Sequence, residues 1–138
     1  MRIFLWAAAV SVLTFGGQVD AQEAADRAAI ERLIGDQFVA FADGDEAEAF
    51  SYASPMIQGM FQTPENFARM VQGGYPMIWG AEDVSFVGLR SEAGRLLMRL
   101  SVRGPDGGRF HFDYEMVQVD GQWRINGVWP VKGDDLSA

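Results

Sequence analysis

The chain has 138 residues, of which 49% are hydrophobic, and it carries a formal net charge of −8 and no cysteine. This length is typical of a single domain, and the apolar content suffices for one core. The acidic balance disfavours nucleic acid as a partner, because phosphate backbones are bound by clustered Lys and Arg, and the absence of cysteine excludes disulfides.

The N-terminal residues 1–21 have the features of a secretory signal peptide. Arg2 precedes an apolar run from Ile3 to Phe15, and Val19-Asp20-Ala21 is a small-residue cleavage sequence. The run is shorter than the roughly 20 residues that span a bilayer, so an uncleaved anchor is the less favoured alternative. We therefore expect a mature chain that begins at Gln22, is periplasmic or secreted, and has no membrane contact after cleavage.

The mature chain begins with helical periodicity. Over residues 24–42, apolar side chains recur at the spacing of one helix face, and Asp43-Gly44 ends the segment. Gly35 is unfavourable inside this helix and suggests close packing on a neighbour. The predicted buried face consists of Ile30, Leu33, Ile34, Phe38 and Phe41.

Two further helices are predicted from their capping residues. Asp45, with Glu48 three positions later, predicts a short helix that reaches about residue 53 and stops before Ser54-Pro55. Thr63-Pro64-Glu65 predicts the next helix, which ends at Gly73-Gly74. Between them, residues 56–61 are too short to classify beyond one turn of helix, and Tyr75-Pro76 is expected to be extended.

After residue 83 the apolar period changes from 3.6 to 2, which is typical of strands. We expect strands over 84–89 and 95–103, followed by a hairpin over 109–131. Asp120-Gly121 predicts a type I′ turn, because such a turn requires positive φ at both central residues.

The turns predict the strand register. Arg103 opposite Arg109, and Val119 opposite Gln122, place the apolar side chains of both hairpins on one face. The predicted apolar pairs are Val102–Phe110, Leu100–Phe112, Met98–Tyr114, Leu96–Met116, Met116–Ile125, Tyr114–Gly127 and Phe112–Trp129. The predicted polar-face pairs are Arg99–Asp113 and Ser101–His111.

The predicted fold class is therefore α+β, with three N-terminal helices packed on one face of a curved four-stranded antiparallel meander sheet. The single domain spans residues 22–131, and residues 132–138 form a polar tail. On the opposite sheet face, four apolar residues are expected to be exposed in a monomer, which suggests a homodimer through this face. They are Leu97, Val117, Val119 and Val128.

Three sequence segments, 41–55, 61–76 and 114–131, resemble an uncharacterised bacterial family, domain of unknown function 4864. The segments are FADGDEAEAFSYASP, FQTPENFARMVQGGYP and YEMVQVDGQWRINGVWPV. The family resembles the superfamily of nuclear transport factor two and ketosteroid isomerase. That resemblance implies a cone-shaped fold in which a sheet curls around helices and leaves a pocket. It does not imply one function, because the superfamily includes enzymes and binding modules.

The candidate chemical residues favour structural interpretations. His111 is the only histidine, so a histidine pair is excluded. Asp113 and Glu115 have Arg99 and Arg124 as neighbours, which favours ion pairs over catalysis. The acids at 43–48 are explained by helix capping and lack the spacing of a calcium loop. The enzymes of the resembling superfamily use a buried carboxylate. No acid is predicted on the inner sheet face, and the alternative source is a helix, for instance through Asp36 or Glu65. We predict no catalytic residue, metal or cofactor.

The aromatic residues leave two interpretations open. They fill the core, or some of them line a small apolar pocket in which Tyr114 is the polar group. The predicted functions are a noncatalytic module that binds a small apolar ligand or a protein partner, a cofactor-free isomerase or dehydratase, and a structural dimerisation subunit. The candidate pocket residues are Phe67, Tyr75, Trp79, Phe112, Tyr114 and Trp129.

Overall fold

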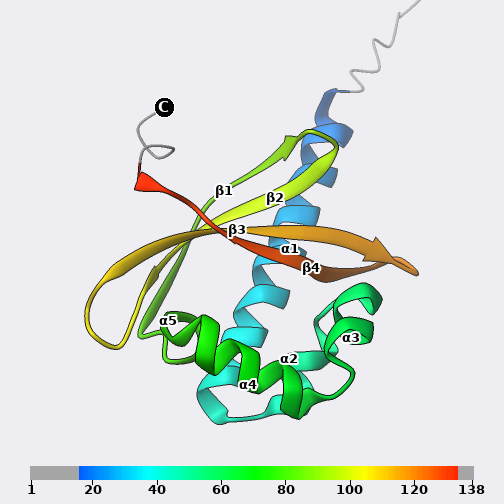
Figure 1. Cartoon of the computed structure of the whole chain (residues 1–138). Coiled ribbons are helices and arrows are strands. Elements are labelled where there is room, and N and C mark those ends of the chain that lie inside the picture. Colours follow the sequence, from blue (N-terminus) through cyan, green and yellow to red (C-terminus); the bar gives the residue numbers. More distant parts are fainter. Residues whose placement is uncertain (1–15, 134–138) are drawn as a thin grey trace, which may run out of the picture.

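In the computed structural model, which describes residues 16–133, five helices precede a four-stranded antiparallel sheet (Figure 1). The elements are α1 (Gly16–Asp43), α2 (Glu46–Ser51), α3 (Pro55–Phe61), α4 (Pro64–Gly74), α5 (Pro76–Trp79), β1 (Asp83–Glu92), β2 (Arg95–Arg103), β3 (Arg109–Val119) and β4 (Gln122–Pro130). The predicted α+β class is confirmed. Most of the predicted signal peptide and residues 134–138 of the predicted tail lie outside the described residues.

The long helix α1 supplies the centre of the core. Ile30, Ile34, Phe38 and Phe41 are buried as predicted, while Leu33 is only partly buried. A Cβ added at Gly35 would meet no atom within 4 Å, so the predicted close packing at this glycine is wrong. Among the described residues, no helix has the length and apolar character needed to cross a membrane.

The capping predictions hold for the next helices. The Asp45 carboxylate accepts a hydrogen bond from the Glu48 amide at 3.1 Å, and Thr63 Oγ1 caps α4 through the Asn66 amide at 3.1 Å. The expected extended conformation at Tyr75-Pro76 is wrong, because Pro76 begins the short helix α5. Proline suits a first helical position, where it needs no amide donor.

The unclassified segment between the predicted helices forms α3. Ser54 has extended backbone angles (φ −64°, ψ 161°), and its hydroxyl caps the helix by accepting from the Ile57 amide at 3.3 Å. Pro55 occupies the first helical position. None of the residues of α3 is buried, so this helix lies at the surface of the helical layer.

The sheet is the predicted meander in the order β1-β2-β3-β4. Asp120 and Gly121 both have positive φ (51° and 77°), as a type I′ turn requires. The register between β2 and β3 agrees with the prediction from Leu96–Met116 to Arg103–Arg109. The described helices lie on one side of the sheet, whose face on that side is called the inner face here, and the opposite face is called the outer face (Figure 1).

The predicted register between β3 and β4 fails at a β-bulge. Pairing follows the prediction from the turn to Met116–Ile125, and then Glu115 pairs with Gly127, which leaves Asn126 as the extra residue. The predicted pairs Tyr114–Gly127 and Phe112–Trp129 are therefore wrong. Tyr114 pairs with Val128, and Phe112 with Pro130.

The bulge reverses the predicted faces of the residues that follow it, among them Val128 and Trp129. Val128 packs against the core and not on the outer face as predicted. Trp129 pairs with Asp113 on the outer face, where its side chain is 49% exposed. The guanidinium of Arg95 lies 5.8 Å from the centre of the Trp129 ring, a cation–π arrangement.

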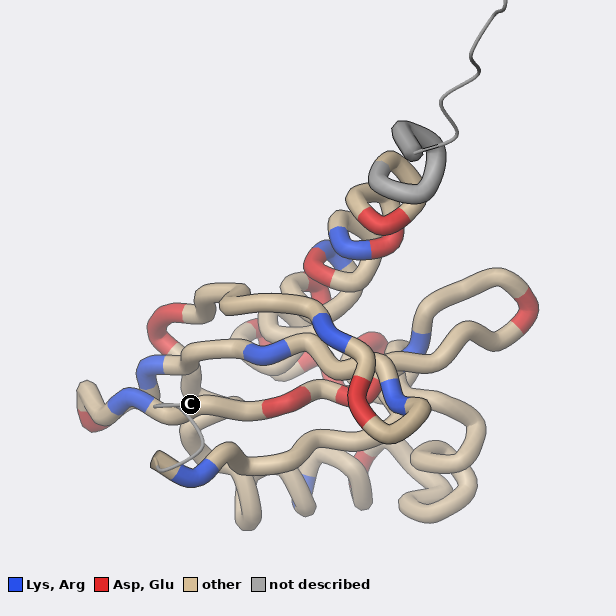
Figure 2. Tube along the Cα trace, turned by 90° about the horizontal axis from the view of Figure 1, so that it is seen from above, with Lys and Arg blue, Asp and Glu red and all other residues tan. Residues whose placement is uncertain are grey.

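The outer face carries ion pairs that join β3 to β2 and to β1, and basic and acidic positions lie close together in Figure 2. Asp113 accepts hydrogen bonds from Arg99 as predicted and also from Arg90. Glu115 lies 3.5 Å from Arg95 and not beside Arg124, whose guanidinium donates to Gln122.

The apolar residues of the outer face are less accessible than predicted. Leu97 is buried, at 7% exposure, which contradicts its predicted exposure. Val117 and Val119 are partly buried. The homodimer through this face stays a prediction, with fewer exposed apolar residues to support it.

Candidate ligand-binding site

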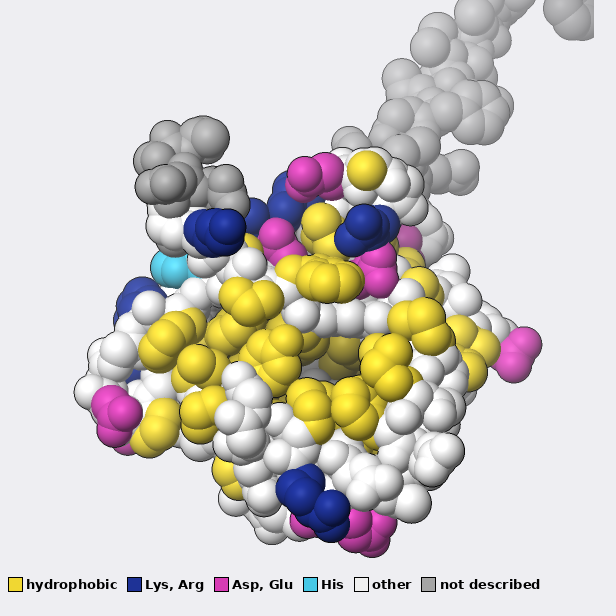
Figure 3. Space-filling view, in the orientation of Figure 1, with side chains coloured by type: hydrophobic (Ala, Val, Ile, Leu, Met, Phe, Trp, Pro, Cys, Tyr) yellow, Lys and Arg dark blue, Asp and Glu magenta, His cyan; other side chains and the backbone are white. Residues whose placement is uncertain are grey.

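A pocket of about 300 Å³ lies between the inner face of β3 and β4 and the helices α3 and α4. Figure 3 shows its mouth as a hollow surrounded by hydrophobic side chains. The lining residues are mainly apolar and come from α1, α3, α4, α5, β3, β4 and the segments that join the helices. They are Gln37, Phe41, Ala53, Met56, Ile57, Met60, Phe61, Phe67, Met70, Val71, Tyr75, Ile78, Tyr114, Glu115, Ile125, Asn126, Gly127, Val128 and Trp129.

The bulge in β4 and the segment before α3 are joined at the pocket wall. The Ser54 amide donates to the Ile125 carbonyl at 2.8 Å, and the Ile125 amide donates to the Tyr52 carbonyl at 2.9 Å. In addition, the Ser54 hydroxyl lies 2.7 Å from Asn126 Oδ1. These bonds hold the start of α3 beside the edge strand, so that α3 forms one side of the pocket.

The exposure of the lining residues distinguishes an inner end from a mouth. Tyr114 and Gln37 are 1% and 3% exposed, so they lie at the inner end. Met56 and Met60 of α3 are 55% and 63% exposed, and together with Trp129 they form the mouth. The buried part of the wall therefore carries these polar groups beside apolar side chains such as Ala53 and Ile78, whereas the exposed side chains of the mouth are apolar.

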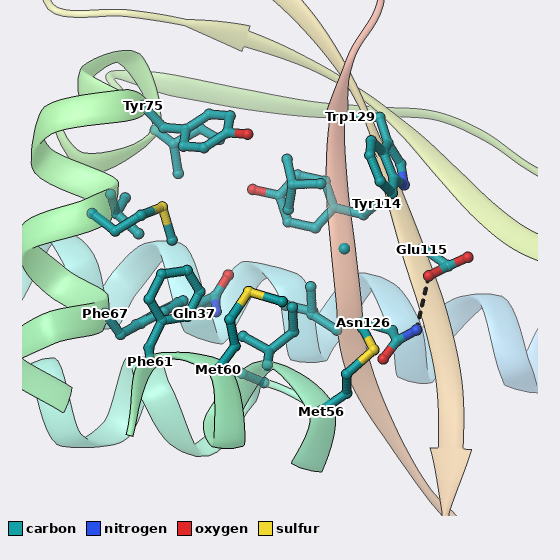
Figure 4. A pocket seen from close by; sticks show the side chains of 18 of the residues that line it. Gln37, Met56, Met60, Phe61, Phe67, Tyr75, Tyr114, Glu115, Asn126 and Trp129 are labelled. Carbon is teal, nitrogen blue, oxygen red and sulfur yellow. Dashed lines mark hydrogen bonds between the residues drawn. The ribbon is translucent and has the colours of Figure 1, made fainter. Parts of the chain in front are cut away.

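The Tyr114 hydroxyl has no hydrogen-bond partner within residues 21–133, and Figure 4 shows it directed toward the hydroxyl of Tyr75. In the same part of the chain, every enclosed side-chain N or O atom has a partner, so this hydroxyl must be open to the cavity. Burial raises the pKa of Tyr114, and the nearby Tyr75 raises it further. The hydroxyl therefore stays protonated and able to donate.

The Gln37 side chain adds a hydrogen-bond acceptor at the inner end. Its Nε2 donates to the Ala49 carbonyl at 3.1 Å, which fixes the orientation of the amide. With the nitrogen held in this way, the Oε1 atom faces the cavity (Figure 4). The pocket thus offers two hydroxyl groups and one amide oxygen to a bound molecule.

Glu115 is the acidic residue of the lining, and it lies on the side of the outer face. Its carboxylate accepts from Asn126 Nδ2 at 2.8 Å and lies 3.5 Å from Arg95 (Figure 4). Among the described residues, no three His, Cys, Asp or Glu side chains are grouped as a metal site would require.

Four of the six predicted pocket residues line this cavity, namely Phe67, Tyr75, Tyr114 and Trp129. The other two pack elsewhere in the core. The Trp79 ring lies 5.5 Å from that of Phe41, and the Phe112 ring lies 6.1 Å from that of Tyr75. The aromatic residues thus fill part of the core and line part of a cavity, and a ligand-binding role for that cavity stays a prediction.

Sequence reasoning missed the contributions of Gln37 and of α3. Gln37 lies beside the predicted apolar face of α1, and the helical periodicity of apolar residues gives no signal for a polar residue there. Met56 and Met60 belong to the segment that was too short to classify. The pair Ser54-Pro55 is the available indication, since it repeats the capping pattern of Thr63-Pro64.

The fold and the pocket define an α+β domain in which helices on one face of an antiparallel meander enclose an apolar cavity. The chain belongs to the family described as domain of unknown function (DUF4864), whose model matches residues 23–137. A solved structure with a similar fold is the solution structure of a SEC-C motif containing protein from Rhodopseudomonas palustris. The two share 15% identity at a TM-score of 0.57, over 76% of this chain and 80% of that chain. No curated protein matches the chain.

Proposed function

We propose that this protein is an exported, noncatalytic module that binds a small apolar ligand in the pocket. The observation that carries the proposal is the hydroxyl of the buried Tyr114, which has no hydrogen-bond partner among the described residues, in a mainly apolar cavity of about 300 Å³. Ligand sites typically combine an apolar wall with a few convergent polar groups, and a volume of this size is at the lower end of their range.

The sequence supports export. The apolar N-terminal run and the Val19-Asp20-Ala21 cleavage sequence are typical of a secretory signal peptide. The family match begins at residue 23, directly after the predicted cleavage position. A periplasmic or secreted location is therefore part of the proposal.

The alternative, a cofactor-free isomerase or dehydratase, requires an acid or base that reaches the substrate. Glu115 is the acid nearest the cavity, and its carboxylate is occupied by Asn126 and Arg95. This arrangement favours binding over catalysis. The resemblance to the nuclear transport factor two superfamily is an analogy of fold and does not decide between the two.

A neutral fluorescent probe, N-phenyl-1-naphthylamine, tests the proposal, because its emission increases in an apolar environment. Val128 lines the pocket, so Val128→Trp should fill it and weaken probe binding at least about tenfold. Val87, in the other edge strand, is 55% exposed and outside the pocket, so Val87→Trp is the matched control. A probe that binds wild type and Val128→Trp equally well would contradict the proposal.

A further inference from the structure

The positions of the polar and apolar groups along the pocket restrict the class of ligand. Polar groups lie at the buried end, on Gln37 and Tyr114, while the mouth presents methionine and tryptophan side chains. A bound molecule therefore meets apolar side chains first and hydrogen-bonding groups last. Each unpaired polar group in a buried site favours a ligand that can satisfy it.

The charge of the lining is the second restriction. None of the lining residues, all of which belong to the described part of the chain, is Lys, Arg or His. An anionic ligand would lose its hydration without gaining a cation, which is costly in an apolar site. Glu115 at the side of the pocket and the formal net charge of −8 disfavour anions further.

The third restriction comes from the hydrogen-bonding groups themselves. The hydroxyls of Tyr75 and Tyr114 are directed toward each other across the inner end (Figure 4), so one ligand atom between them would accept from both. The Gln37 oxygen can in addition accept from a ligand hydroxyl. A carbonyl or alcohol oxygen fits these groups.

We propose that the ligand is an uncharged amphiphile that binds with its hydrogen-bonding head between Tyr75 and Tyr114 and its apolar tail along the methionines of α3. This inference rests on the proposed function. Met56 and Met60 suit a tail because methionine is unbranched and adapts to different apolar shapes. The head would supply the partner that the Tyr114 hydroxyl lacks within the described residues.

Three probes of similar size test the inference by displacement of N-phenyl-1-naphthylamine from protein produced from the full-length sequence. They are 4-phenyl-2-butanone, which is neutral and has an acceptor, 3-phenylpropanoate, which is anionic, and butylbenzene, which has no polar group. We expect the ketone to bind at least about tenfold more tightly than the carboxylate. Equal or tighter binding of the carboxylate would overturn the inference.

Tyrosine variants test the position of the head. Tyr114→Phe should weaken the ketone about five- to tenfold and leave butylbenzene unchanged, because only the ketone uses the hydroxyl. Tyr75→Phe should have the same selective effect, and Tyr75 is less buried than Tyr114, so the loss of its hydroxyl should disturb folding less. Tyr52→Phe is the control, since that hydroxyl donates to Glu48 at 2.9 Å outside the pocket. Equal losses for ketone and butylbenzene in both pocket variants would contradict the head position.

The outcomes separate this inference from the proposed function. If the fluorescent probe binds and Val128→Trp prevents its binding, the pocket binds apolar molecules. A preference for the carboxylate would then contradict only the inference that the head of the ligand is uncharged. If neither the fluorescent probe nor butylbenzene binds, both the proposed function and the inference are wrong.

Discussion

Ser54 and Asn126 are joined by a side-chain hydrogen bond of 2.7 Å that connects the start of α3 to the bulge in β4. Ser54 is 1% exposed, and the same hydroxyl caps α3. The Ser54 side chain thus contacts both α3, which forms one side of the pocket, and the β-bulge in β4, which forms its edge.

Because Ser54 has two roles, its substitution should lower the free energy of unfolding more than the loss of an ordinary helix cap does. Ser54→Ala should lower the free energy of unfolding by about 2–3 kcal/mol, because it removes the cap and leaves the partly buried Asn126 oxygen without this partner. Thr63→Ala, which removes an exposed cap with no tertiary bond, should cost about 1 kcal/mol. Urea unfolding measures both values. Equal costs for the two variants would show that the bond to Asn126 has no net effect.

The pH dependence of stability should report the ion pairs of Asp113. Burial alone would raise the pKa of this carboxyl, but hydrogen bonds from Arg90 and Arg99 outweigh burial and lower it from 3.8 to about 2. A depressed native pKa stabilises the fold above the unfolded value, by about 2 kcal/mol here, and the stabilisation is lost as the pH falls from about 4 to about 2.

The measurement compares wild type with Asp113→Asn in urea at pH 7 and at pH 2. At pH 7 the variant should be less stable by about 2–4 kcal/mol, because it removes the counter-charge that Arg90 and Arg99 share and leaves Arg90 with only the exposed Glu92. This difference should shrink by about 2 kcal/mol at pH 2. Glu92→Gln, which removes an exposed partner of Arg90, should change stability by less than about 1 kcal/mol. A difference between wild type and Asp113→Asn that is independent of pH would contradict the account.

The bulge at Asn126 can be tested through the two aromatic residues whose pairing it changes. Phe112→Ala should cost about 3–5 kcal/mol, because Phe112 is 2% exposed in the core. Trp129→Ala should cost only about 1 kcal/mol, since the ring is half exposed and contributes mainly its contact with Arg95. Chemical denaturation of both variants measures this difference. A loss of stability for Trp129→Ala as large as that for Phe112→Ala would contradict the bulge and favour the regular register.

The open surroundings of Gly35 predict a stabilising substitution. No atom lies within 4 Å of a Cβ built at this position, and α1 is continuous through it. Gly35→Ala should raise the free energy of unfolding by about 1 kcal/mol, because alanine loses less backbone entropy in a helix. A lower melting temperature in the variant would indicate a contact that the packing does not show.

The sequence was sufficient for the parts of the fold that local chemistry decides. Asp120-Gly121 fixes a turn, and the turn fixes the register as far as Met116–Ile125. Beyond that pair, the alternation of apolar residues predicts the wrong pairs, because the bulge inserts one residue and shifts the register. The glycine beside it, Gly127, is the available sign, and Gly88 likewise follows the bulged Val87 in β1.

The pocket was predictable only in part, because a cavity depends on how separate elements meet. Aromatic residues such as Phe67 and Tyr114 were expected on the inner side from their periodicity, and both line the cavity. The position of α3 depends on bonds between Ser54, Ile125 and Asn126, which are distant in sequence. No periodic pattern in residues 56–61 contains that information.

The most direct test of the pocket is a titration with N-phenyl-1-naphthylamine followed by NMR of protein labelled at the methionine methyl groups. Met56, Met60 and Met70 line the cavity, whereas Met98 and Met116 belong to the buried core outside it. The account predicts saturable shift changes at the three lining methyl groups and little change at the other two. Saturation without changes at the lining methionines, or changes confined to Met98 and Met116, would contradict binding in this pocket.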